Sequence, residues 1–151
     1  MPPARRLWDS NVVIDYLAGS QAIQPACDLI ISQARAGNIE IYVSAIAELE
    51  VAYLEGFSEA DSEQKIREFF SRPYIVPAAF DIPVAREARR LIRSHHLKPP
   101  DAAHLATAIL HHVPLLETKD PDLHRVDGQE GNPTITIQWP RYEGTLPMLP
   151  P

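Results

Sequence analysis

Short apolar segments rich in β-branched residues alternate along this chain with longer segments of helical character. The segments expected to form strands are the residues ending at Trp8 and the ranges 39–43, 74–76, 114–117 and 134–139. The expected helices lie between them, at 11–17, 25–36, 45–56, 58–72, 81–96 and 101–112, and 118–126 is expected to form a loop. Strands that alternate with helices form a parallel sheet covered by helices on both faces. We therefore predict an α/β fold of three layers, with a central parallel sheet of about four to five strands.

The composition is typical of one globular domain. The chain has 151 residues, of which 45% are hydrophobic and 23% are charged, and this excludes an intrinsically disordered chain. Its one cysteine, Cys27, cannot form an intramolecular disulfide, which fits a reducing compartment. No segment approaches the roughly 20 apolar residues of a membrane span, and the residues after the basic N-terminus do not resemble a signal peptide. We therefore expect a soluble, cytoplasmic protein that does not enter the membrane.

Acidic side chains recur where the predicted strands end. One follows the first strand, two lie on the helix after the second strand, one opens a helix of its own, and two follow the strand 114–117; in order they are Asp9, Glu48, Glu50, Asp101, Asp120 and Asp122. Ligands of parallel sheets bind beyond the carboxyl ends of the strands. Two carboxylates about 4 Å apart repel by roughly 4 kcal/mol, so a cluster needs protons or a cation. Hard oxygen ligands without cysteines favour Mg²⁺ or Mn²⁺ over zinc.

Each acid also has an ordinary structural interpretation. Asp9 and Asp101 stand where each can cap a helix, and the two aspartates after the strand 114–117 can form a turn. Glu48 and Glu50 can simply be solvated on their helix. Residues two apart on a helix point to different faces, so at most one of these glutamates enters a site.

Basic residues are fewer, since the formal net charge is −6, which by itself argues against a nucleic-acid-binding protein. Bound divalent ions would offset part of this charge. Lys119, next to Asp120, is the best-placed candidate to contact a substrate phosphate. Arg86, Arg90 and Arg93 form one helical stripe that can bind a phosphate backbone, pair with acids such as Glu87, or dock an acidic partner segment.

Four segments resemble the motifs of the PIN-domain ribonucleases, and in particular the VapC toxins of type II toxin–antitoxin systems. They are DSNVVIDYL (9–17), VSAIAELEVAYLEG (43–56), PPDAAHLATAIL (99–110) and PLLETKDPDL (114–123). The resemblance covers roughly residues 5 to 126, and its register selects Glu50 over Glu48. It implies a PIN-like domain over 1–130, with a C-terminal strand and proline-rich tail over 131–151 that is part of that domain or appended to it.

The activity implied by this resemblance is that of an endoribonuclease that depends on Mg²⁺ or Mn²⁺. Asp9, Glu50, Asp101 and Asp120 would be both the catalytic residues and the metal ligands, directly or through water. The supporting residues would be Ser10, which can orient Asp9 or a metal-bound water, together with Asp122 and Lys119. His104 lies on the same helix face as Asp101 and is a further candidate, whereas the adjacent histidine pairs 95–96 and 111–112 are not.

The resemblance also implies partners: an RNA substrate, a VapB-like antitoxin whose segment fills the acidic groove, and a second copy of the chain in a homodimer. One alternative is a catalytically inactive PIN-like module that binds RNA or protein, although all four acids are present. Another is a phosphoryl-transfer domain of the receiver or haloacid-dehalogenase type. Asn11 stands where the latter requires its second aspartate, and the paired acids of the former are missing.

Overall fold

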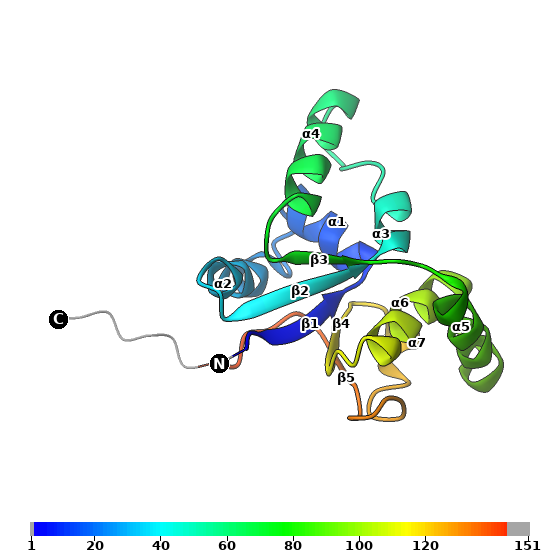
Figure 1. The fold of residues 1–151 in the computed structure, drawn as a ribbon. Coiled ribbons are helices and arrows are strands. Elements are labelled where there is room, and N and C mark those ends of the chain that lie inside the picture. The colour runs from blue at the N-terminus through cyan, green and yellow to red at the C-terminus, as the bar shows by residue number, and fades with distance from the viewer. Residues whose placement is uncertain (1, 145–151) are drawn as a thin grey trace.

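The computed structural model describes residues 2–144 and contains the predicted parallel sheet (Figure 1). Its five strands lie in the order β3-β2-β1-β4-β5, and every neighbouring pair is parallel. The strands are β1 (Ala4–Trp8), β2 (Ile39–Ser44), β3 (Ile75–Ala78), β4 (Leu115–Glu117) and β5 (Thr136–Gln138). The order places β1 at the centre, so its carboxyl end has a neighbouring strand end on either side. The part of the expected proline-rich tail that follows residue 144 lies outside the described residues.

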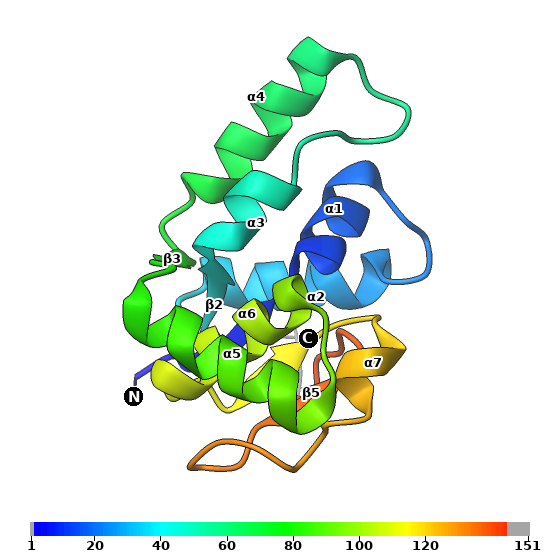
Figure 2. The same ribbon diagram turned by 90° about the vertical axis from the view of Figure 1, so that its right-hand side faces the viewer.

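Seven helices surround the sheet in the described part of the chain (Figures 1 and 2). They are α1 (Ser10–Ala18), α2 (Gln24–Arg35), α3 (Ala45–Glu50), α4 (Glu59–Phe70), α5 (Ile82–His95), α6 (Pro99–Leu110) and α7 (Pro121–His124). None of the helices within residues 2–144 is both long and apolar enough to cross a membrane.

Two apolar cores, one on each face of the sheet, hold the three layers together. Adjacent residues of β1 belong to different cores: Trp8 packs with residues of α1, α2 and α4, whereas Leu7 packs with residues of α5 and α6. This division follows from the period-two alternation of side chains along a strand. The predicted α/β fold with helices on both faces is confirmed.

Two of the helix boundaries that differ from the prediction bear on the site. The helix expected over 45–56 ends at Glu50, because Val51 leaves the helical conformation and is buried together with Leu54. Burial of these two side chains in the core outweighs the helical propensity of the segment. The helix expected to open at Asp101 begins earlier, at Pro99, a residue suited to the first helical position. Asp101 therefore lies inside the first turn of α6 and does not cap it.

A short helix, α7, occupies part of the region expected to be a loop. Asp120 caps it by accepting a hydrogen bond from the backbone N–H of Asp122 at 2.9 Å, and Pro121 fills its first position. The helix fixes the direction of the chain immediately after β4. It thereby places two aspartates at the carboxyl edge of the sheet.

An arginine near the start of β1 ties that strand to the end of α6. Arg5 donates from its two terminal nitrogens to the carbonyl oxygens of His111 and His112, at 2.9 and 2.8 Å. The last carbonyls of a helix have no partner within the helix, so a guanidinium at this point satisfies them. β1 and α6 are thus joined at the end of the sheet opposite to the acidic residues.

A buried ion pair joins β1 to β4. Glu117 is completely buried and accepts hydrogen bonds from Arg6 at 3.2 Å and from the indole N–H of Trp8 at 2.9 Å. The Gln138 amide and the backbone N–H of Arg141 also donate to this carboxylate, at 3.1 and 2.9 Å. The sequence prediction treated 114–117 only as an apolar strand. The structure shows that its last residue, Glu117, forms an ion pair with Arg6 of β1.

Candidate metal centre

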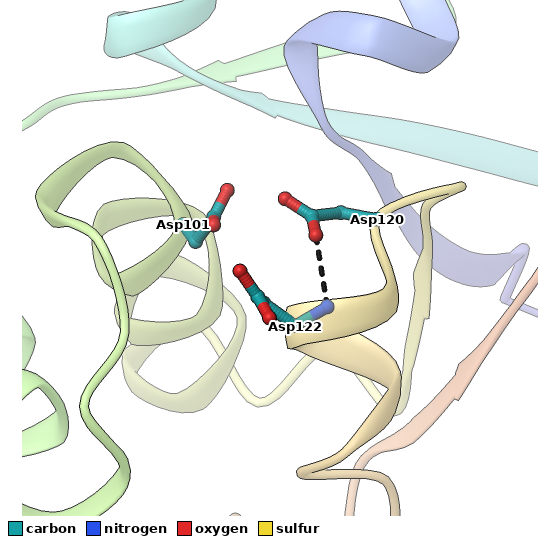
Figure 3. Close-up of side chains that lie close together, drawn as sticks. All are labelled: Asp101, Asp120 and Asp122. Atoms are coloured by element: carbon teal, nitrogen blue, oxygen red, sulfur yellow. Dashed lines mark hydrogen bonds between the residues drawn. The ribbon is translucent and has the colours of Figure 1, made fainter.

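The acidic residues meet at the carboxyl ends of the two central strands β1 and β4. Asp9 follows β1 directly and Asp120 lies shortly after β4, while Asp101 faces them from the first turn of α6. Figure 3 shows the carboxylates of Asp101, Asp120 and Asp122 turned toward one another from α6 and α7. One oxygen from each of these three lies within 4.8 Å of the other two. Of the four acids predicted to converge at this edge, Asp101 and Asp120 belong to this group, together with Asp122, which was predicted as a supporting neighbour.

The hydroxyl of Thr118 connects Asp9 to Asp120. It donates to Asp9 Oδ2 at 2.5 Å and accepts from the backbone N–H of Asp120 at 2.9 Å. The other oxygen of Asp9 accepts from the backbone N–H of Val12 at 3.0 Å, so Asp9 does cap α1. Asp9 can therefore cap α1 with one oxygen and still be joined to Asp120 through Thr118 with the other. Thr118 was not among the predicted site residues, although its hydroxyl, two residues before Asp120, was the available signal.

The cluster contains more negative charge than its protein surroundings compensate. Burial, together with the neighbouring Asp120, raises the pKa of Asp101 to about 7. Burial also raises the pKa of Asp9, which is 2% exposed. Oδ2 of Asp101 is buried and has no hydrogen-bond partner among the described residues. A donor set of carboxylate oxygens with an unsatisfied buried atom fits a hard divalent cation such as Mg²⁺ or Mn²⁺.

Glu50, Ser10 and His104 form a second group beside the aspartates. The Ser10 hydroxyl donates to Glu50 Oε1 at 2.7 Å, and His104 Nε2 lies 3.1 Å from both that oxygen and Ser10 Oγ. The hydrogen bond with His104 is the main cause that lowers the pKa of Glu50. Glu48 is exposed on the other side of α3, which agrees with the choice of Glu50.

Ser10 was expected to orient Asp9 or a metal-bound water, and its hydroxyl instead contacts Glu50 and His104. His104 is 2% exposed and lies nearer to the centre than sequence reasoning indicated. Both Asp9 and Asp101 have pKa values that His104 lowers, so this imidazole lies within electrostatic reach of both acids. The signal for His104 was its position one helical turn after Asp101.

Two of the four predicted basic residues, Lys119 and Arg90, pair with acidic side chains. Lys119 Nζ lies 2.5 Å from Asp15 Oδ2, in a pair that joins the loop after β4 to α1. Arg90 pairs with Glu87 and with Glu130, so the structural interpretation of this residue agrees with the geometry. The two other arginines of the predicted stripe, Arg86 and Arg93, are exposed on α5. Neither Lys119 nor the stripe lies in the cluster of Figure 3.

This chain is thus an α/β domain with a cluster of carboxylates at the carboxyl edge of its parallel sheet, where their oxygen atoms could hold a cation. The family model described as PIN domain matches residues 6–129, and the chain belongs to the PIN domain family. The resemblance inferred from the four motifs is thereby confirmed. Because the chain is a PIN domain, it is not a phosphoryl-transfer domain of the receiver or haloacid-dehalogenase type.

Solved structures with the same fold include chains of two toxin–antitoxin assemblies. A chain of a toxin–antitoxin complex from Klebsiella pneumoniae is 27% identical with a TM-score of 0.61, and the match covers 79% of this chain and 89% of that chain. A chain of VapBC2 from Rickettsia felis, bound to a DNA fragment from its promoter, is 16% identical with a TM-score of 0.65 and coverages of 89% and 98%. The comparison with curated proteins gave no match.

Proposed function

We propose that this chain is a divalent-metal-dependent endoribonuclease, the toxin of a VapBC-type toxin–antitoxin pair. The observation that carries the proposal is the convergence of Asp101, Asp120 and Asp122, with a buried carboxylate oxygen of Asp101 that has no partner among the described residues. Such crowding of acids is unfavourable without a cation. Membership of the PIN domain family supports a nuclease, which is a hydrolase.

The residues that would hold Mg²⁺ or Mn²⁺ are Asp9, Asp101 and Asp120, with Asp122 beside them and Glu50 reaching the site directly or through water. A divalent cation bound there lowers the pKa of water and neutralises charge that develops on a phosphodiester. Hydrolysis of this kind leaves a 5′-phosphate and a 3′-hydroxyl.

The protein's own hydrogen bonds would keep these acids in position during the reaction. Thr118 holds Asp9 and the backbone of Asp120, and His104 and Ser10 hold Glu50 in its ionised form. Support of this kind fixes the direction in which a carboxylate presents its free oxygen. The acids therefore need little rearrangement when a cation and a phosphate arrive.

An antitoxin partner and a cytoplasmic location form part of the proposal. They rest on the similarity to a chain of the Klebsiella pneumoniae toxin–antitoxin complex at 27% identity. A homodimer is proposed from the family resemblance alone. The main alternative is an inactive PIN-like module that binds RNA or protein. The presence of all four predicted acids in the sequence, two of them clustered with Asp122, counts against it.

The test is cleavage of single-stranded RNA by the purified chain with added Mn²⁺. The variants Asp9→Asn and Asp120→Asn are expected to lose at least about 100-fold in kcat/KM, because each removes a ligand charge. Glu50→Gln is expected to lower kcat/KM as well, and Glu48→Gln is its matched control. Both residues lie on α3, and of the two only Glu50 contacts His104. Unimpaired cleavage by Asp120→Asn would end the proposal. A melting temperature that Mn²⁺ leaves unchanged would favour the inactive module.

A further inference from the structure

A tryptophan lies at the same edge of the sheet as the acidic centre and takes no part in it. Trp139 follows β5 directly, and the carbonyl of its predecessor Gln138 accepts from the backbone N–H of Thr118 at 2.9 Å. Thr118 in turn contacts both Asp9 and Asp120. The backbone at the start of the acidic loop therefore lies one strand spacing from the backbone that leads into Trp139.

The two tryptophans of the chain differ in their surroundings. The other tryptophan of the chain, Trp8, is fully buried and its indole N–H donates to Glu117. Trp139 is 48% exposed, so much of its ring faces solvent. Burying an indole in the core would contribute more to stability than leaving it exposed. The exposed ring is therefore available to a ligand.

Lys119 lies over the ring of Trp139. Its Nζ is 5.8 Å from the ring centroid, and the same ammonium pairs with Asp15. An ammonium has three donors, so one ion pair leaves protons that can bind a phosphate oxygen. The side chain of Lys119 is 29% exposed, which leaves it accessible to solvent. An aromatic face and a cation thus lie side by side, next to the loop that carries Asp120.

We propose that Trp139 and Lys119 form a binding site for one nucleotide of single-stranded RNA beside the acidic centre, with the base stacked on Trp139 and its phosphate near Lys119. Proteins that bind single strands combine stacking on aromatic rings with contacts from basic side chains. Bases within a duplex are already stacked on their neighbours, so only an unpaired base can cover this ring. The inference rests on the proposed function and adds the two residues that would hold one unpaired nucleotide beside the acidic centre.

Fluorescence of the full chain tests this site independently of cleavage. A short, unstructured RNA oligonucleotide, added in the presence of EDTA to prevent cleavage, is expected to quench the emission of the exposed Trp139, whereas Trp8 is buried. The same RNA annealed into a duplex is expected to quench it much less. Trp139→Phe removes this signal and keeps an aromatic face. Equal quenching by the duplex, or no quenching by either RNA, would overturn the proposal.

Kinetics provide the second measurement. Trp139→Ala is expected to raise KM for single-stranded RNA roughly tenfold, with kcat changed less than about twofold, and Trp139→Phe is expected to recover most of the loss. Phe57→Ala is the matched control, because the Phe57 ring forms a similar pair with a lysine. Lys65 Nζ, on α4, lies 4.9 Å from the centroid of that ring. KM values of Trp139→Ala and Phe57→Ala that both equal that of the unaltered chain would overturn the proposal.

The two proposals fail in different ways. A chain that cuts RNA normally when Trp139 is alanine retains the proposed activity and loses the stacking site. A chain that never cuts RNA, but whose Trp139 emission is quenched by single strands alone, loses the proposed activity and retains the site. A chain that neither cuts RNA nor responds to it in fluorescence contradicts both.

Discussion

The Thr118 hydroxyl and the Asp9 carboxylate are 2.5 Å apart, and this contact joins the loop after β4 to the carboxyl end of β1. The same hydroxyl accepts from the backbone of Asp120, so one small side chain positions two acids from different strands. An aspartate held in this way cannot rotate freely, so the orientation of its carboxylate is already set by the protein.

Thr118→Val is therefore expected to weaken Mn²⁺ binding by about 10- to 100-fold, because valine keeps the shape and removes the hydroxyl. Isothermal titration calorimetry measures this change directly. Thr107→Val is the matched control, since its buried hydroxyl donates only to the Ala103 carbonyl within α6, at 2.7 Å. Equal affinity of the Thr118 variant and the unaltered chain would show that Thr118 does not position the site.

The pKa of Asp101, raised to about 7, predicts how pH affects the metal-free protein. Between about pH 4 and pH 7 the folded chain binds this proton more tightly than the unfolded chain. The contribution of Asp101 to the free energy of unfolding therefore falls as pH rises through this window. Urea denaturation in EDTA at several pH values is expected to show that the unaltered chain loses stability relative to Asp101→Asn as pH rises.

The same proton competes with a metal ion, so Mn²⁺ affinity is expected to rise as pH increases toward 7 and then to level off. Asp28→Asn is the control for the denaturation series, because Asp28 is exposed on α2. A stability difference between the unaltered chain and Asp101→Asn that does not vary with pH would contradict the raised pKa.

The next prediction concerns the pKa of Glu50, which lies with Ser10 and His104 beside the aspartates. His104 is the main cause of its lowered pKa, and Ser10 makes a smaller contribution in the same direction. His104→Ala is therefore expected to raise the pKa of Glu50 more than Ser10→Ala does. Carboxyl chemical shifts followed by NMR during a pH titration measure both values. A larger rise in the Ser10 variant would reverse the assigned order of the two hydrogen bonds.

The buried pair of Arg6 and Glu117 predicts a large effect on stability. Glu117→Gln leaves the Arg6 guanidinium without a countercharge, and a loss of about 3–5 kcal/mol in the free energy of unfolding is expected. Glu63→Gln, which breaks an exposed pair with Arg67 on α4, is expected to cost less than about 1 kcal/mol. Chemical denaturation compares the two. Similar losses in both variants would show that burial does not decide the strength of this pair.

The strands and the acidic residues could be predicted because each leaves a local signal. Apolar β-branched runs mark the strands, and an acid directly after such a run lies at the ligand-binding edge of a parallel sheet. The choice of Glu50 over Glu48 required the family resemblance, since the helix period shows only that the two point to different faces.

The remaining features depend on contacts between distant parts of the chain. The early end of α3 follows from the burial of Val51, which local propensity does not reveal. The role of Ser10 depends on where His104 lies after the chain folds. Glu117 looked like the end of an apolar strand, and only its pairing with Arg6 shows why a carboxylate occupies a fully buried position.

The hydrogen bonds from Arg5 to the end of α6 have a consequence for the distant acids. β1 carries Arg5 near its start and leads into Asp9, while α6 carries Asp101 in its first turn and is held by Arg5 at its end. About 15 Å of helix separates these two points of α6. Strand β1 and helix α6 are thus held together at one end. Asp9 and Asp101 lie at their other ends, so this contact helps to set the spacing of the two carboxylates. A change at Arg5 is therefore expected to alter the spacing of Asp9 and Asp101 without altering either residue.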